Sequence, residues 1–219
     1  MQTSAQRWST LLILLFFSGV IFLFFHLYLR PAPSKNVAEI STEEPVLTQP
    51  TVGIINPTRG LEDAQVTVVL FGDFQCEACR DTAVSIDVVR REFPKEVRVV
   101  WKDFPNESLH EEATPSAISA RCAGDQGAFW SYHDLLFSQM NLLNASTNTT
   151  LADALGLEPN AFARCLSTRS PLPRIQRDFE EGLELSITAT PTLFINDERF
   201  VGAISSDELR EAITRHLPL

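Results

Sequence analysis

A Cys-x-x-Cys motif directly after a buried-strand pattern constrains the fold of this chain most strongly. The motif is Cys76-Glu77-Ala78-Cys79, and an apolar, β-branched run at residues 66–71 precedes it. The helical pattern that follows places the first cysteine at a helix N-terminus, where free backbone N–H groups and the helix dipole stabilise a thiolate. The second cysteine lies one turn further on, near enough to close a disulfide. A strand, a turn and a helix that opens on two cysteines therefore predict a reactive dithiol.

The N-terminal sequence predicts a membrane anchor. Residues 11–29 form an apolar run with the length of a bilayer-spanning helix, and Trp8 and Tyr28 lie near its ends. We expect residues 1–10 in the cytoplasm, a transmembrane signal anchor at residues 11–29, and a flexible tether rich in Pro, Ser, Thr and Glu at residues 30–50. A cleaved signal peptide is the alternative, but its apolar region is shorter and needs a small-residue cleavage site.

The number and position of the cysteines indicate the compartment in which the folded domain lies. All four cysteines follow the apolar run, and an even number in an exported domain predicts two disulfides. We therefore expect the folded domain on the periplasmic, extracytoplasmic side of the cell (inner) membrane.

All 28 acidic residues lie beyond residue 35, and the net charge of the chain is −10. Nucleic acid is not an expected partner, because its phosphates require a basic surface.

The predicted elements alternate in a strand–helix–strand unit, then a helical block, then two strands and a last helix. A strand–helix–strand unit of this length implies a parallel pair with a right-handed crossover. From residue 51 on, the pattern predicts an edge strand at 51–55, strands at 66–72 and 97–102, helices at 76–93, 115–123, 128–140, 151–155, 160–166 and 173–185, strands at 191–195 and 199–201, and a helix at 207–216.

Four stretches in this order resemble the DsbA-like branch of the thioredoxin superfamily. They are residues 63–79 with the dithiol, Trp101-Lys102-Asp103-Phe104-Pro105, residues 122–137, and residues 188–195 with Thr190-Pro191. The resemblance covers residues 54–219. It implies an α/β protein with a thioredoxin fold in residues 51–219 and a helical insertion at about 106–187. It also implies thiol–disulfide oxidoreductase activity, with the sulfur pair as its own redox centre and no bound cofactor or metal. We expect a monomer.

Cys76 is the predicted nucleophile and Cys79 the more buried partner that completes the exchange. The alternative is that the Cys76–Cys79 pair has a purely structural role or supplies half of the ligands of a zinc site. Zinc usually needs a second close pair of Cys or His ligands. Cys122 and Cys165 lie too far apart in the chain to form such a motif. We predict a structural disulfide between these two, with a pair of buried free cysteines as the alternative.

Thr190 and Pro191 are site residues by resemblance. A cis bond between them would place the Thr190 backbone beside the Cys76 sulfur, where it could pair with an incoming peptide strand. A trans proline that starts an edge strand is the alternative, since most X-Pro bonds in folded proteins are trans.

Two positions depart from the strong oxidants of the family, which resemble Cys-Pro-His-Cys. Glu77 and Ala78 separate the cysteines here, and a negative Glu77 should raise the pKa of Cys76 and make the disulfide less oxidising. An exposed, screened Glu77 is the alternative. Many relatives also carry a buried acid six residues before the first cysteine, where this chain has Leu70. Lys102 and Glu77 are candidates to replace that acid through water.

Several aromatic residues recur at helical spacing in the insertion, and we predict that they form its core: Phe129, Trp130, Tyr132 and Phe137. His133, among them, is predicted to be a structural hydrogen-bonding residue.

The leading hypothesis is an enzyme that forms disulfides in exported proteins through Cys76 and Cys79. Its expected partners are exported proteins with thiols or disulfides, the membrane through residues 11–29, and a membrane redox partner that re-oxidises it. A reductase or isomerase of the same fold is the alternative within the enzyme class. A metal-binding or chaperone module that uses the cysteines as ligands is the alternative from another class.

Overall fold

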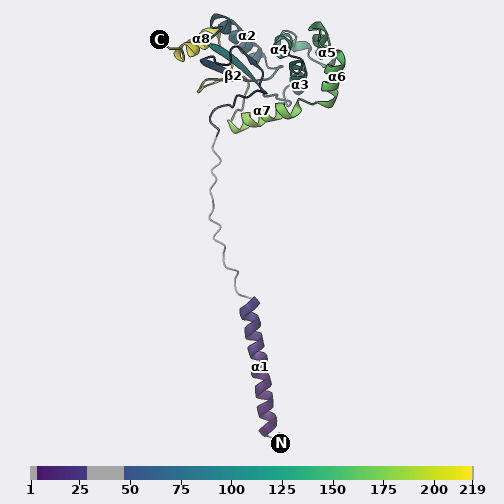
Figure 1. Ribbon diagram of the computed structural model, residues 1–219, viewed down its shortest axis with the longest axis vertical. Coiled ribbons are helices and arrows are strands. Elements are labelled where there is room, and N and C mark those ends of the chain that lie inside the picture. The colour runs from purple at the N-terminus through teal and green to yellow at the C-terminus, as the bar shows by residue number, and fades with distance from the viewer. Residues whose placement is uncertain (1–3, 29–46, 219) are drawn as a thin grey trace. The chain divides into compact units, whose positions relative to one another are not determined.

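The computed structural model describes residues 4–28 and 47–218 of a chain that divides into two units, Met1–Glu44 and Pro45–Leu219 (Figure 1). In the first unit, the sequence predicted as an anchor is helical and forms α1 (Ser4–Tyr28). Over the described residues, no helix has both the length and the apolar character needed to cross a membrane. The predicted transmembrane span is therefore not confirmed. Most of the predicted tether, at residues 30–46, lies outside the described residues.

The second unit is a mixed sheet with helices on both faces. Its elements are β1 (Thr58–Arg59), β2 (Val66–Gly72), α2 (Glu77–Glu92), β3 (Val97–Asp103), α3 (Ala113–Gly124), α4 (Phe129–Ser138), the 3₁₀ turn η1 (Met140–Leu142), α5 (Ala145–Ala154), α6 (Pro159–Thr168), α7 (Leu172–Glu184), β4 (Thr192–Ile195), β5 (Glu198–Val201) and α8 (Ser206–Arg215). The strand order is β1-β3-β2-β4-β5. β2 and β3 are parallel, and the other neighbouring pairs are antiparallel.

The central strand β2 is apolar along its whole length because both of its faces are covered. Val68 and Leu70 belong to the main core with α2 and α8, whereas Val69 and Phe71 belong to a second cluster. Helix α7 lies across the sheet from α2 (Figure 1) and packs on β3. Gly182 allows this approach, since an added Cβ would lie 2.5 Å from the Phe104 ring.

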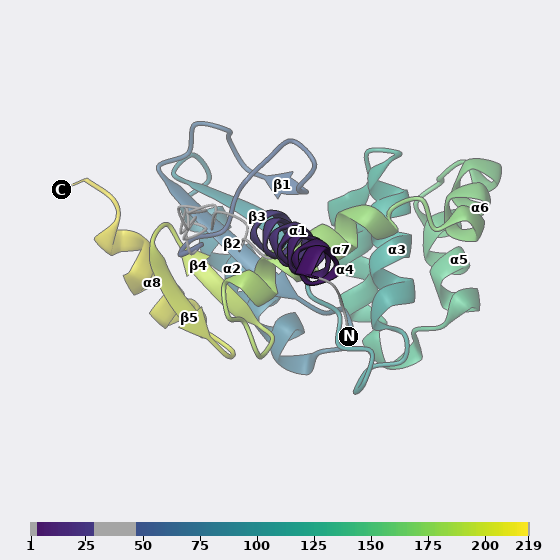
Figure 2. The ribbon, with the colours of Figure 1, turned by 90° about the horizontal axis from the view of Figure 1, so that it is seen from below.

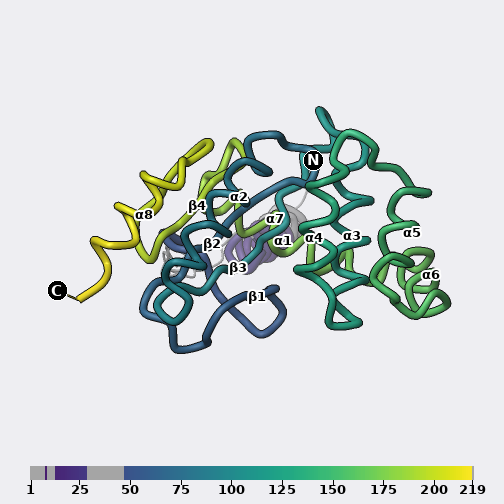
Figure 3. Tube along the Cα trace, turned by 90° about the horizontal axis from the view of Figure 1, so that it is seen from above, coloured from purple at the N-terminus to yellow at the C-terminus, as the bar shows by residue number. Residues whose placement is uncertain are grey.

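The insertion between β3 and β4 is helical, as the resemblance implies, and consists of α3 to α7. Helices α3 to α6 gather beyond the β1–β3 edge of the sheet, while α8 lies at the β5 edge (Figure 2). Within this group α5 and α6 lie farthest from the C-terminus (Figure 3). The expected α/β thioredoxin fold with a helical insertion is confirmed.

The edge strand was predicted in the wrong place. Residues 51–55 form no strand, and the edge strand beside β3 is β1, where Thr58 pairs with Val100. The segment before β1 satisfies its backbone groups with side chains instead. The Thr51 N–H donates to Glu181 Oε1 at 2.5 Å, and the Ile55 carbonyl accepts from Arg121 at 2.9 Å.

Candidate active site

The dithiol lies where β2 turns into α2. Cys76 is the N-cap of α2, with φ −86° and ψ 115°, and its sulfur accepts a hydrogen bond from the Cys79 N–H at 3.2 Å. Both cysteines are unpaired, so the structure shows the dithiol form. Cys76 is 8% exposed and Cys79 is fully buried. An incoming disulfide or thiolate can therefore reach Cys76 first.

The two thiols have opposite acidities. A hydrogen bond from the Cys79 side chain is the largest cause that lowers the pKa of Cys76, from its ordinary 9.0 to about 6. Bonds from the Thr190 side chain and the Cys79 backbone lower it further, while burial and the charge of Asp73 raise it. Burial, reinforced by the bond to Cys76, raises the pKa of Cys79 well above its ordinary value. At neutral pH the dithiol thus holds one thiolate and one thiol.

The loop before β4 closes over the Cys76 sulfur. The Thr190–Pro191 bond is cis, as the resemblance implies. The Thr190 carbonyl oxygen lies 3.6 Å from Cys76 Sγ. Thr190 is half-buried and the preceding Thr188 and Ala189 are exposed, so the backbone of this loop faces solvent beside the reactive sulfur.

The structure also places the residues that the sequence suggested as modulators of the dithiol. Glu77, in the first turn of α2, is exposed, which fits the alternative that water screens its charge. The carboxylate that raises the pKa of Cys76 belongs instead to Asp73. Ala78 packs at the margin of the main core. Lys102 does not replace the missing acid at Leu70, because its ammonium lies 2.6 Å from Glu181 Oε2 in a buried ion-pair cluster under α7.

Asp73 and His110 were not recognised from the sequence. Asp73 is 2% exposed, and its Oδ2 lies 2.8 Å from His110 Nδ1. The two residues are 37 positions apart in the chain. No sequence motif or helix-capping pattern links these two residues. They come together only because the fold places the turn before α2 against the segment between β3 and α3.

A groove of about 880 Å³ begins at Thr190. The stretch after β3, helix α7 and residues 187–190 line it. Apolar lining comes from Phe104, Leu172, Ile175, Phe179, Leu183 and Ile187, and charged lining comes from Glu107 and Glu180. No Lys or Arg lines the groove among the described residues. An extended peptide bonded to Cys76 would find an apolar and acidic surface next to the reactive sulfur.

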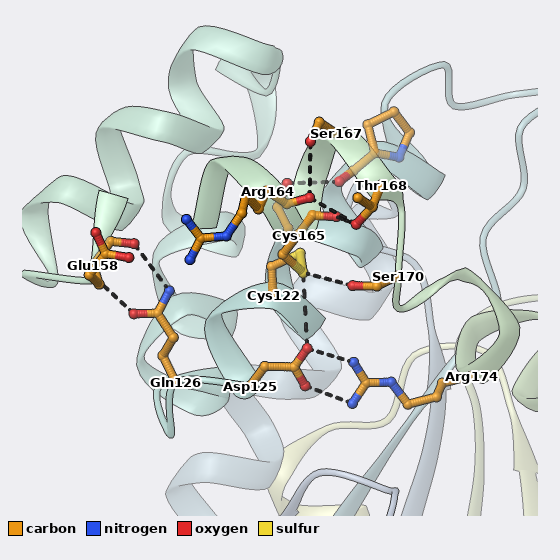
Figure 4. Close-up of a disulfide and its surroundings, with 12 residues drawn as sticks. Cys122, Asp125, Gln126, Glu158, Arg164, Cys165, Ser167, Thr168, Ser170 and Arg174 are labelled. Carbon is orange, nitrogen blue, oxygen red and sulfur yellow. Dashed lines mark hydrogen bonds and ion pairs between the residues drawn. A yellow bond between two sulfur atoms is a disulfide. The ribbon is translucent and has the colours of Figure 1, made fainter. Parts of the chain in front are cut away.

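The predicted second disulfide is present (Figure 4). Cys122 on α3 and Cys165 on α6 are bonded, with a Cα–Cα distance of 5.8 Å. Ser170 Oγ donates to the Cys165 sulfur at 3.4 Å. Asp125 forms two hydrogen bonds with Arg174, at 2.8 and 2.9 Å, beside the bridge (Figure 4). The bridge fastens two helices of the insertion and lies apart from the dithiol along the chain.

The predicted aromatic core of the insertion is confirmed. Phe129, Tyr132 and Phe137 are buried, and Trp130 packs against them. His133 is buried and its Nδ1 lies 2.8 Å from Asp134 Oδ1. Burial lowers the pKa of His133, so this ring is neutral and acts as a structural group.

A family model described as Thioredoxin matches residues 54–215. The chain belongs to the thioredoxin family. Curated relatives include the Na(+)/H(+) antiporter NhaA 1 of Salinispora arenicola, which is 35% identical over 71% of this chain and 24% of that protein. The NhaA antiporter of Herminiimonas arsenicoxydans is 30% identical over 75% of this chain and 26% of that protein. The chain spans about a quarter of the length of these relatives.

Solved structures share the fold of this thioredoxin-family chain. BdbD from Bacillus subtilis, in its oxidised form, has a TM-score of 0.67 and 21% identity over 74% of this chain and 92% of that one. A thioredoxin-like oxidoreductase from Silicibacter pomeroyi has a TM-score of 0.66 and 24% identity, with the same coverage. The catalytic domain of Proteus mirabilis ScsC has a TM-score of 0.66 and 22% identity over 75% of this chain and 90% of that one.

No metal site accompanies the dithiol within residues 4–28 and 47–218, where no three His, Cys, Asp or Glu side chains are arranged to hold an ion. The family and the geometry of Cys76 and Cys79 support a thiol–disulfide oxidoreductase.

Proposed function

We propose that this chain donates disulfides to exported proteins by exchange through Cys76 and Cys79. The observation that carries this proposal is the stabilised Cys76 thiolate, whose pKa lies at about 6. Stabilising the reduced form of a dithiol makes its disulfide a stronger oxidant. Burial keeps Cys79 protonated, so Cys76 is the thiolate of the pair in either direction of exchange.

The exchange proceeds in two steps. A substrate thiolate attacks Cys76 Sγ of the oxidised protein, the Cys76–Cys79 bond breaks, and Cys79 leaves with the electron pair and takes up a proton. A second substrate thiol then loses its proton and attacks the substrate sulfur of the mixed disulfide. Cys76 leaves as the stabilised thiolate. The substrate loses two electrons and the protein gains them.

The substrate lies along the loop that ends in Thr190 in this proposal. The Thr190 backbone, 3.6 Å from Cys76 Sγ, is placed to pair with an extended peptide. The groove that begins there accepts the side chains that flank the substrate cysteine.

The proposed site of action is the extracytoplasmic side of the cell membrane. The Cys122–Cys165 disulfide supports this location, because structural disulfides persist in oxidising compartments. The reduced dithiol must return its two electrons to an acceptor after each cycle, and a membrane redox partner is the proposed acceptor.

Equilibration with glutathione tests whether the chain donates disulfides or reduces them. We expect a reduction potential between those of a strong oxidant and of thioredoxin, in the range of about −120 to −230 mV. A value near about −270 mV would assign the alternative role of a reductase. In Cys79→Ser the Cys76 thiolate can attack a substrate disulfide but Cys79 cannot resolve the product, so this variant should accumulate mixed disulfides with exported proteins that carry disulfides, and Cys76→Ser should not. Tight metal binding by the reduced protein, without mixed disulfides in Cys79→Ser, would favour the metal-binding module instead.

A further inference from the structure

Hydrogen bonds of Asp73 and Gln75 hold the turn that presents Cys76 in place. Asp73 directly follows β2, and its carbonyl oxygen accepts a hydrogen bond from the Cys76 N–H at 3.2 Å. Its carboxylate Oδ1 accepts from the Gln75 N–H at 2.8 Å. Gln75 Oε1 accepts from the Glu112 N–H at 2.6 Å. The turn is thereby tied to itself and to the segment between β3 and α3.

The Asp73 carboxyl group is buried and makes two further contacts. Its side chain is 0% exposed, and Oδ2 accepts from the Asn106 N–H at 2.9 Å and lies 2.8 Å from His110 Nδ1. A buried carboxylate stays ionised only with hydrogen bonds or a cation to offset its desolvation. The His110 side chain is 25% exposed, so it lies between this buried carboxyl and solvent. Its neighbours Glu111 and Glu112 are exposed and half-exposed acids on the same segment.

We propose that the contact between Asp73 and His110 sets the charge beside the Cys76 sulfur and positions the turn that carries it. Leu70 leaves the position six residues before Cys76 without an acid, and Asp73 supplies one three residues closer. The pair joins the turn before α2 to the segment before α3. This inference rests on the proposed dithiol exchange.

The charges of Asp73 and His110 determine whether each residue stabilises or destabilises the Cys76 thiolate. A negative Asp73 opposes a negative sulfur, and its charge raises the pKa of Cys76. A protonated His110 makes the pair neutral, so the thiolate forms more readily beside it. When a substrate dithiol is oxidised, one of its two protons goes to Cys79 and the other to water.

Two single variants of the full chain separate charge from packing. Asp73→Asn removes the negative charge and keeps one of the two oxygen acceptors, so the Cys76 thiolate should gain stability and the disulfide should become more oxidising. His110→Asn keeps an N–H donor toward Asp73 and removes the cation, so it should do the opposite. We expect the equilibrium constant with glutathione to shift about three- to tenfold in opposite directions, tenfold corresponding to one unit of pKa.

His216→Asn is the matched control, since His216 lies at the end of α8, 3.6 Å from Glu198, and not in the turn. The ultraviolet absorbance of the thiolate, followed against pH, gives a second readout. The pH at which the Cys76 thiolate forms should be higher in His110→Asn than in the wild type. This readout decides the question even if Asp73→Asn fails to fold.

Shifts of both variants in the same direction, or no shift beyond that of the control, overturn the inference. A wild-type chain that does not exchange disulfides with glutathione overturns the proposed function instead. The two failures are therefore distinguishable.

Discussion

Cys76 and Cys79 are chemically identical residues one helical turn apart, and their surroundings give them different roles. The N-cap position exposes Cys76 to the unpaired N–H groups of α2, and the Cys79 thiol and N–H both donate to its sulfur. Cys79 lies inside the main core, where a charge would be desolvated. The difference in acidity between the two thiols therefore comes mainly from the helix N-terminus on one side and the apolar core on the other.

Replacing Cys79 tests this account at the level of single atoms. Cys79→Ala removes the side-chain donor, so the pKa of Cys76 should rise from about 6 toward 9.0. Cys79→Ser keeps an O–H donor and should hold the pKa of Cys76 lower than Cys79→Ala does. The rate of alkylation of Cys76 by iodoacetamide, measured against pH, reports the thiolate fraction in each variant. Equal midpoints in the two variants would show that the thiol hydrogen bond does not control the acidity of Cys76.

The residues found from the sequence are those that local patterns can reveal. Cys76 and Cys79 follow from a spacing, and Pro191 from its place before a strand in a family pattern. The role assigned to Glu77 rested on its nearness in sequence, but its side chain points to water while the buried Asp73 acts on the sulfur. The Asp73–His110 contact depends on a tertiary approach across 37 residues, for which the sequence contains no periodic signal.

The elements of the insertion are joined to the sheet by a buried ion-pair cluster. Arg121 of α3 lies 2.6 Å from Asp103 of β3 and 2.5 Å from Asp178 of α7, and Lys102 pairs with Glu181 of α7. Burial is the main cause that raises the pKa of Asp178 to about 6. Each charge has a partner on a different element, so the cluster fixes how α3 and α7 lie on β3.

The sequence patterns located most helices but missed the start of α5. The pattern predicted a helix only from Leu151, whereas α5 begins at Ala145. Asn144 caps this helix, because its side-chain oxygen accepts hydrogen bonds from the Ser146 and Thr147 N–H groups. Asn148 then lies buried inside the helix. The stretch before Leu151 is polar, so hydrophobic periodicity alone could not show that it is helical.

The bridge between α3 and α6 should stabilise the insertion without taking part in exchange. The double variant Cys122→Ser, Cys165→Ser opens a loop of 43 residues, and the chain-entropy model gives a loss of about 4 kcal/mol in the free energy of unfolding. Denaturant unfolding under non-reducing conditions measures this loss. Below the unfolding transition, exchange with glutathione through Cys76 should match the wild type. A loss of exchange in the folded variant would contradict a purely structural role for the bridge.

At the scale of the whole domain, the fold gathers the exchange site from segments that are distant in the chain. The turn after β2 supplies the sulfur, the loop before β4 supplies Thr190, and α7 of the insertion supplies much of the groove. The thioredoxin core thus positions the dithiol, while the insertion shapes the groove beside it, which is the substrate surface in the proposed exchange. The charge of that surface is negative, because Glu107 and Glu180 line it and no described Lys or Arg does.

This charge should select among substrates of equal reactivity. For two peptides that differ only in Lys or Glu beside one cysteine, the wild type should oxidise the Lys peptide several-fold faster in kcat/KM, and added salt should reduce the difference. The double variant Glu107→Lys, Glu180→Lys should reverse the preference, whereas Glu211→Lys, on the exposed face of α8, should leave it unchanged. Oxidation of dithiothreitol, which is too small to fill the groove, should be the same in all three proteins. An unchanged preference in the double variant, with dithiothreitol oxidation intact, would mean that substrates reach Cys76 by another path.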